Sequence, residues 1–110
     1  MKTYNLTLEN MPNKEKKLTN IAYVESFKSP RSGKPVANQF KITLQNGIEV
    51  FQSYNTIIAV KADGETYLDY DCWNYSNTTA RYRKIFLNED TKTTRKKIEQ
   101  GLYGCVHLNK

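Results

Sequence analysis

Apolar and polar residues alternate through much of the first two thirds of the chain, a pattern typical of strands with one buried face. Two such runs occupy residues 2–8 and 19–27, and a third begins at Phe40. The continuous apolar run at residues 56–60 predicts a central strand covered on both faces, and residues 66–68 predict a return strand. We therefore expect an antiparallel sheet of about five strands, connected as a meander.

The sequence Gln45-Asn46-Gly47 predicts the turn of a hairpin inside this meander. A two-residue turn at Asn46-Gly47 would place Leu44 and Ile48 on opposite faces of the sheet. A three-residue turn, with Gly47 in the left-handed conformation, aligns Leu44 with Ile48 and gives one apolar face. We therefore predict the bulged, three-residue turn.

Beyond residue 76 the apolar spacing changes to three and four residues, which predicts helix. Ser76 suits an N-cap, because its hydroxyl can accept a hydrogen bond from a free amide of the first turn. The helix is expected over residues 77–87, with Tyr82, Ile85 and Phe86 on its inner side. Of the cations on this helix, Arg81 and Lys84 are expected to point outward, and Arg83 is expected near an edge.

A second helix is expected over residues 91–100, with Thr94 and Ile98 facing inward. Gly101 fits its C-terminal end. Residues 102–108 form a short apolar run that predicts a last strand or a docked tail. The fold class predicted is α+β, an antiparallel meander of about five strands with two short C-terminal helices.

The composition agrees with one domain spanning residues 1–110, because 38% of the residues are hydrophobic and 25% are charged. Residues 28–38 contain two prolines, one glycine and three cations, which predicts a mobile basic surface loop. The same composition would suit contact with phosphate.

The net charge of +6 is distributed unevenly along the chain. Residues 1–41 carry +5, residues 42–77 carry −4, and residues 78–110 carry +5. If the two basic ends meet on one face, they would attract phosphate or an acidic protein surface. A solvated, soluble exterior has the same composition.

The strongest functional pattern is a set of cations on the two predicted helices, with Ser, Thr and Asn residues between them. Such residues suit contact with a phosphate backbone and carry little base-specific information. Together with two aromatic residues of the preceding segment, they form the predicted nucleic-acid or partner-binding site: Arg81, Arg83, Lys84, Lys92, Arg95, Lys96, Lys97, Trp73 and Tyr70.

Trp73 is the only tryptophan and lies in a segment rich in aromatic residues, 67–87. It would serve as a core anchor between the sheet and the first helix, which the pattern favours. Alternatively, with Tyr70 and Tyr75, it would form an exposed platform that stacks on single-stranded bases.

The residues suited to catalysis are few. The chain has one histidine, His107, and lacks the common nucleophile, nucleotide-binding and zinc-protease motifs. Asp69 and Asp71 would share a face on a strand and could hold a divalent metal, although Asp is also common in turns. Because no third ligand is indicated, we expect no enzyme activity, no metal and no cofactor.

The two cysteines, Cys72 and Cys105, lack metal-ligand spacing, and Cys105 lies in an apolar run that suits a small core residue. Two other absences bear on localisation. No apolar run approaches the ~20 residues that span a bilayer, and the first residues lack the apolar core of a secretory signal. We therefore expect a cytoplasmic protein with reduced thiols.

The motif W-x-Y-S-x-T-T-x-x-Y-R-x-x-F-L, at residues 73–87, resembles a family of short, mostly uncharacterised proteins encoded by bacteriophages and prophages. The likeness extends over residues 50–104. It implies a phage setting, in which small proteins without catalytic motifs often bind host machinery, as anti-CRISPR proteins do. No catalytic residue is carried over from the resemblance.

Two functional hypotheses follow, and they rank above a third, a small metal-dependent enzyme that would use Asp69 and Asp71. The first is a non-enzymatic phage-type protein that inhibits a host nucleic-acid-targeting defence complex, with a host protein or ribonucleoprotein as its partner. The second is a module that binds DNA or RNA directly through its basic helices. In both, the protein acts in the cytoplasm of the host cell without a membrane partner.

Overall fold

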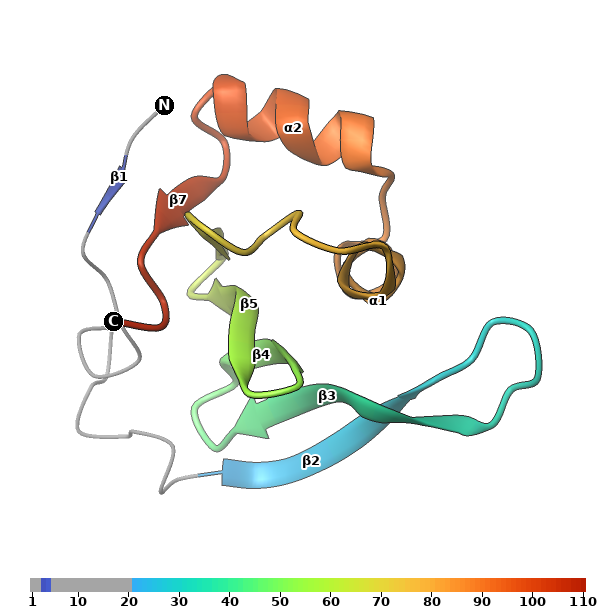
Figure 1. Cartoon of the computed structure of the whole chain (residues 1–110). Coiled ribbons are helices and arrows are strands. Elements are labelled where there is room, and N and C mark those ends of the chain that lie inside the picture. Colours follow the sequence, from blue (N-terminus) through green and yellow to red (C-terminus); the bar gives the residue numbers. More distant parts are fainter. Residues whose placement is uncertain (1–2, 5–20) are drawn as a thin grey trace.

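The computed structural model describes residues 3–4 and 21–110, which form a sheet with two helices on one face (Figure 1). Within these residues the sheet has seven strands in the order β1-β7-β6-β5-β4-β3-β2. The elements are β1 (Thr3–Tyr4), β2 (Ile21–Lys28), β3 (Pro35–Leu44), β4 (Glu49–Ser53), β5 (Thr56–Ala62), β6 (Glu65–Asp69), α1 (Asn77–Leu87), α2 (Thr91–Glu99) and β7 (Gly104–Val106).

Five consecutive strands, β2 to β6, form an antiparallel meander, so the predicted fold class is confirmed. Two strands extend this meander at one edge. β7 returns after the helices and pairs parallel with β6, and the short β1 pairs parallel with β7. Only β1 of the strand predicted at residues 2–8 is described, and the rest of that prediction lies outside the described residues.

The bulged hairpin turn between β3 and β4 is confirmed. The Leu44 amide donates to the Ile48 carbonyl at 2.9 Å, and the Gly47 amide donates to the Leu44 carbonyl at 2.9 Å. Gly47 has φ 89°, a left-handed conformation that glycine adopts without steric cost. As a result Ile42 lies opposite Val50, and the apolar residues of both strands share a face.

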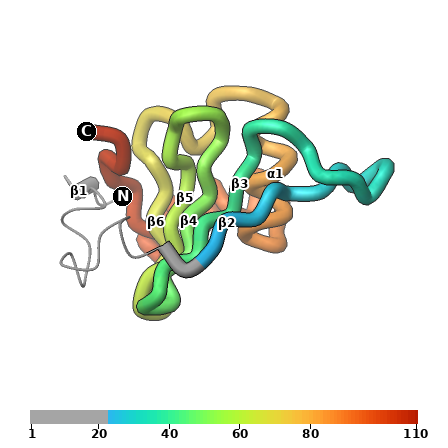
Figure 2. The backbone as a smooth tube through the Cα atoms, turned by 90° about the horizontal axis from the view of Figure 1, so that it is seen from below, coloured from blue at the N-terminus to red at the C-terminus, as the bar shows by residue number. Residues whose placement is uncertain are grey.

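The loop predicted over residues 28–38 is wrong in its extent, because β3 already begins at Pro35. The connection is a tight tip at residues 29–34, where the Ser29 amide donates to the Lys34 carbonyl at 2.9 Å. Proline is tolerated as the first residue of a strand, so the composition concealed a hairpin that projects from the sheet (Figure 2). The mobility of this tip stays a prediction.

β2 is the last strand in the order, and its pairing with β3 is irregular. The register shifts between Ile21 and Tyr23 and again between Ser26 and Lys28. Along this strand Tyr23 and Val24 are each 51% exposed.

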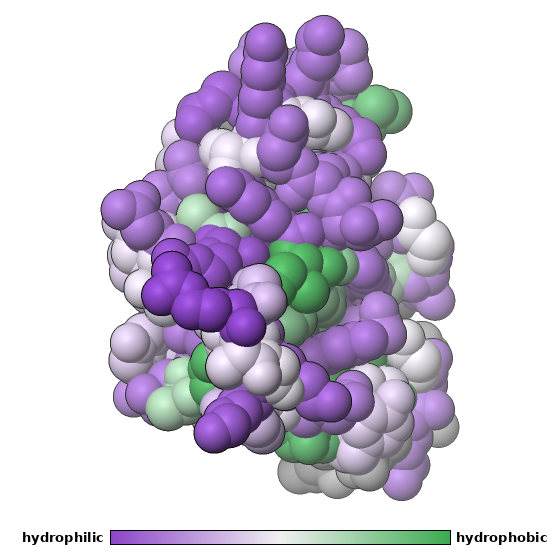
Figure 3. Space-filling view, turned by 90° about the vertical axis from the view of Figure 1, so that its right-hand side faces the viewer, coloured by the Kyte–Doolittle hydropathy of each residue, from purple (hydrophilic) through white to green (hydrophobic). Residues whose placement is uncertain are grey.

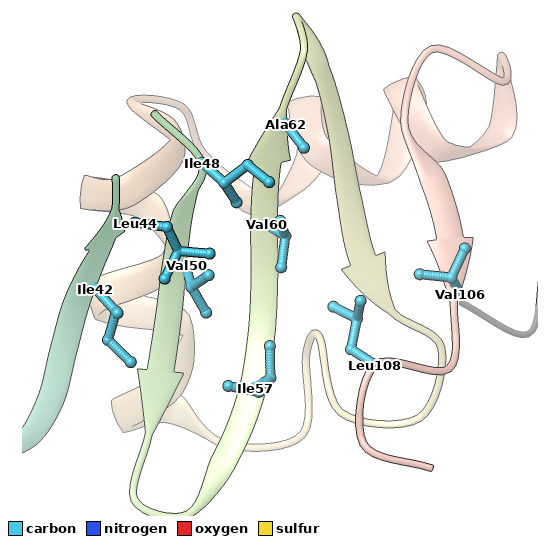
Figure 4. Packing of buried hydrophobic residues seen from close by; sticks show 9 residues of the cluster. All are labelled: Ile42, Leu44, Ile48, Val50, Ile57, Val60, Ala62, Val106 and Leu108. Atoms are coloured by element: carbon cyan, nitrogen blue, oxygen red, sulfur yellow. The ribbon is translucent and has the colours of Figure 1, made fainter. Parts of the chain in front are cut away.

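Each face of the sheet carries its own hydrophobic cluster. The face turned away from the helices has an aliphatic cluster from β3, β4, β5, β7 and the residues after β7 (Figure 4). The opposite face packs against α1 and α2. There, Phe51 of β4 lies against the rings of Phe27 and Phe86, at centroid distances of 5.2 and 5.9 Å. The core therefore has two layers divided by the sheet.

The inner side of α1 differs from the prediction. Tyr82 and Phe86 are buried as expected, but Ile85 is 45% exposed and Arg83 is fully buried. The buried stripe runs through Thr79, Tyr82, Arg83 and Phe86, which is the i, i+3, i+4, i+7 spacing of one helix face. The helix is therefore rotated relative to the predicted stripe, because two of its inward positions are polar.

The start of α1 is capped as predicted, and the start of α2 is capped in the same way. Ser76 accepts from the Thr79 amide at 3.1 Å at the start of α1, and Asp90 accepts from the Thr93 amide at 2.8 Å at the start of α2. Thr94 and Ile98 are buried on the inner side of α2, as predicted. In the described part of the chain, neither helix is long and apolar enough to span a membrane.

Candidate functional site

Five of the predicted cations are exposed on the outer sides of the two helices. Arg81 and Lys84 lie on α1, and Lys92, Arg95 and Lys96 lie on α2. None of them has an ion-pair partner within 4.0 Å in the described residues. Figure 3 shows the side of the molecule that lies to the right in Figure 1, where hydrophilic side chains predominate around several separate hydrophobic areas. We call these five residues the basic helix surface.

Lys97 is separate from this surface because it is committed to a network inside the molecule. Its ammonium group lies 2.8 Å from Glu89, which also accepts from Tyr103 at 2.8 Å and from Thr94 at 2.6 Å. Burial opposes the ionisation of Glu89, but the hydrogen bonds from Lys97, Thr94 and Tyr103 outweigh it and lower the pKa of the carboxyl. The hydrogen bond to Glu89 in turn raises the pKa of Lys97.

Arg83 is the least expected residue of the site, because its guanidinium is buried and no carboxylate of the described residues pairs with it. Its Nη2 atom donates to Thr91 Oγ1 at 2.8 Å and to Asn74 Oδ1 at 3.3 Å. The Nε and Nη1 atoms are buried and have no hydrogen-bond partner in the described structure. Burial lowers the pKa of Arg83, and the positive charge of Arg95 lowers it further.

Trp73 lies beside both arginines. The guanidinium carbon of Arg83 is 5.0 Å from the centre of its ring, and that of Arg95 is 5.2 Å away. These distances are typical of cation–π contacts. The half-buried indole also packs against the helix-side hydrophobic cluster, so its predicted role as an anchor of this core is confirmed. Base stacking on Trp73 stays a prediction.

Tyr70 is not part of this group, although it is 43% exposed. Its ring lies against His107, with 5.3 Å between ring centroids, near the ends of β6 and β7. Tyr75 is 51% exposed. The structure therefore brings Trp73 together with Arg83 and Arg95 and places Tyr70 at another location.

Asp69 and Asp71 have different surroundings. Asp69 is buried and accepts from the amides of Asp71, Cys72 and Leu108, at 3.2, 2.9 and 2.9 Å. It thereby fixes the turn after β6 and the segment after β7. Asp71 is exposed and lies 3.7 Å from His107. The described residues contain no group of three His, Cys, Asp or Glu side chains that could hold a metal ion.

Both cysteines are free, and Cys105 is buried in the helix-side cluster, as expected of a small core residue. Burial raises the pKa of both thiols, and nearby aspartates raise it further. Neither cysteine is therefore favoured as a thiolate nucleophile.

Asn74 and Thr91, the two residues that hold Arg83, were not predicted. Asn74 lies in the segment before α1, nine residues before Arg83, and Thr91 lies at the start of α2, eight residues after it. The hydrogen bonds of Arg83 therefore join these two segments. Thr79, Tyr82 and Arg83 have the spacing of one helix face, but this spacing does not mark Arg83 as buried, because two of the three residues are polar.

A family model matches residues 7–101, which is most of the chain. The chain belongs to DUF8033, a family of unknown function. The match includes the meander, Trp73 and both helices. No curated protein and no solved structure matches the chain.

Proposed function

We propose that this chain is a non-enzymatic binding protein that contacts the nucleic acid of a host nucleic-acid-targeting complex through its basic helix surface. The supporting observation is that five cations lie exposed on two adjoining helices, without ion-pair partners in the described residues. Exposed cations in this arrangement can neutralise successive phosphates and release their counterions.

The proposal that it lacks catalysis is supported by how the polar residues of the fold are used. Asp69 accepts hydrogen bonds from three backbone amides, and Glu89 accepts them from three side-chain donors. Both carboxylates therefore have structural roles. His107 is the only histidine in the chain, and its Nδ1 atom is 3.7 Å from the exposed Asp71. A general base also needs an orienting partner and a reacting group within reach.

The setting of this proposal comes from the resemblance to bacteriophage proteins at residues 73–87. A small phage protein that binds a host defence complex would act as an inhibitor of the anti-CRISPR type. Because this chain is basic, it would contact guide RNA or target DNA rather than mimic DNA. Direct DNA or RNA binding without a host complex is the alternative function.

Nucleic-acid binding is tested with duplex DNA, single-stranded DNA and structured RNA at several salt concentrations. We expect binding that weakens with salt. The variant Arg81→Glu/Lys92→Glu should show a smaller salt slope, by about 0.9 for each phosphate that the protein no longer neutralises. The matched control is Lys28→Glu/Lys34→Glu, which makes the same change in net charge on the β2–β3 hairpin.

Equal losses of affinity in the two double variants would show that only net charge matters and would refute the basic helix surface. No binding to any of the three nucleic acids at low salt would refute direct contact. The host-complex part of the proposal is tested separately, by measuring whether the protein blocks target cleavage by a purified CRISPR effector with its guide RNA. Unchanged cleavage would argue against inhibition of that effector.

A further inference from the structure

We propose that Arg83, Arg95 and Trp73 form a discrete site for a single phosphate group, with Asn74 and Thr91 beside it. This inference deepens the proposed function and rests on it for the natural source of the phosphate, a nucleic-acid backbone. The site shares Arg95 with the basic helix surface. It differs from that surface because its second charge, on Arg83, is buried.

The charge of Arg83 has no counter-ion among the described residues. The side chain is 0% exposed, yet no carboxylate lies within ion-pair distance of it in the described residues. Two of its three nitrogen atoms have no hydrogen-bond partner. Buried charges in folded proteins are generally paired, so a buried guanidinium without an anion indicates a missing partner.

No residue in the described part of the chain supplies this partner. Glu89 is the acid that acts on Arg83 electrostatically. Both of its oxygens are already engaged, since Oε1 accepts from Lys97 and Tyr103 and Oε2 accepts from Thr94. Within the described residues, the countercharge of Arg83 is therefore left to a bound molecule.

Arg95 adds a second positive charge at the same ring. The guanidinium carbons of Arg83 and Arg95 lie 5.0 and 5.2 Å from the centre of the Trp73 ring, and the charge of Arg95 destabilises that of Arg83. A phosphate carries up to two negative charges and several acceptor oxygens, so it can accept hydrogen bonds from Arg95 and compensate the charges of both arginines. A single carboxylate would leave one of these charges uncompensated.

The exposure of the residues indicates how the phosphate is reached. Arg95 and Asn74 are exposed, whereas the free nitrogens of Arg83 are closed off from solvent. The phosphate therefore meets Arg95 and Asn74 at the surface, and Arg83 supplies the second positive charge from beneath. Thr91 accepts a hydrogen bond from Arg83 and still has its own hydroxyl proton to donate.

The single tryptophan makes this site measurable without a label. Inorganic phosphate is titrated into the protein at constant ionic strength, and the emission of Trp73 is recorded. We expect a saturable change, which Arg95→Gln weakens by about tenfold or more, as expected for the loss of one charge-assisted hydrogen bond. The control is Lys34→Gln, which removes the same charge from the β2–β3 hairpin and should bind as wild type does.

Circular dichroism first shows whether the Arg83→Met variant folds. If this variant folds, it should weaken phosphate binding in the same way. If it does not fold, the Arg95→Gln result decides the test. The proposal is overturned if the titration does not saturate, or if Lys34→Gln loses as much affinity as Arg95→Gln. It is also overturned if acetate, titrated in the same way, binds as tightly as phosphate, because the site would then be one for carboxylates.

The outcome can be separated from that of the proposed function. Saturable phosphate binding without any nucleic-acid binding would support the site and refute the function. Salt-dependent nucleic-acid binding with no response of Trp73 to phosphate would support the function and refute the site.

Discussion

The two faces of the sheet differ in what they bury. The face turned away from the helices carries an aliphatic cluster, and the amide of Leu108 in this cluster donates to the buried Asp69. The helix side buries aromatic side chains together with several polar ones, including Ser53, Thr79, Arg83 and Thr94. Aliphatic packing is explained by stability alone, whereas buried polar groups cost free energy unless each has a partner. A functional site is therefore expected on the helix side.

The largest expected effect separates the two faces at neighbouring positions of β4. Val50 belongs to the aliphatic cluster and Phe51 to the helix-side cluster, and both are 0% exposed. Phe51→Ala should destabilise the protein by about 4 kcal/mol and Val50→Ala by about 2 kcal/mol, because the larger side chain leaves the larger cavity. Urea unfolding measures both, and equal costs would show that the helix layer collapses to fill the space.

The next effect tests the paired polar groups under α1. The hydroxyls of Ser53 and Thr79 lie 2.9 Å apart and both residues are 0% exposed. Thr79→Val should cost about 1–3 kcal/mol, since it leaves the Ser53 hydroxyl buried without this partner. Adding Ser53→Ala should recover part of the loss. The single variant Ser53→Ala is measured as well. If Ser53→Ala costs as much in the Thr79→Val background as it does in the wild-type protein, the two hydroxyls are not coupled.

A smaller, pH-dependent effect should come from Glu89. Its pKa is lower in the folded state than the usual value of 4.5, so its contribution is present above about pH 4.5 and is lost as the pH falls through the folded value. Glu89→Gln should therefore flatten the loss of stability in this acidic range. The measurement is thermal unfolding of both proteins at a series of pH values, and parallel curves would contradict the assignment.

The smallest change in stability is expected at Arg83, although it is fully buried. Arg83→Met loses the hydrogen bonds to Asn74 and Thr91, but it also removes an unpaired buried charge, so the net effect should stay within about 1 kcal/mol. Urea unfolding in phosphate-free buffer measures it. A cost comparable to that of Phe51→Ala would mean that Arg83 is a structural residue whose charge is satisfied without a ligand.

The meander could be predicted because its signals are local. Alternation, Gly47 in the bulged turn and the apolar run of β5 each act within a few residues. The pairing of β7 with β6 and β1 carries no such signal, since it joins segments far apart in the sequence. The start of β3 was hidden by the loop-like composition around Pro35.

The candidate site was predicted as a set of cations but not as an arrangement. Sequence cannot distinguish an exposed cation such as Lys96 from Lys97, whose partner Glu89 is eight residues away. A buried arginine is also predicted to lie at the surface, because the buried face of a helix is inferred from its apolar side chains alone. The burial of Arg83 depends on the packing of Trp73 and α2, which no local pattern encodes.

The two register shifts in β2 affect how copies of this chain behave when they are concentrated. An outer strand of eight residues with exposed Tyr23 and Val24 would offer a template for strand-to-strand polymerisation. The shifts interrupt the regular row of amides and carbonyls, so an incoming strand can match only a few residues at a time. We therefore expect this irregular edge to resist fibre formation through the sheet.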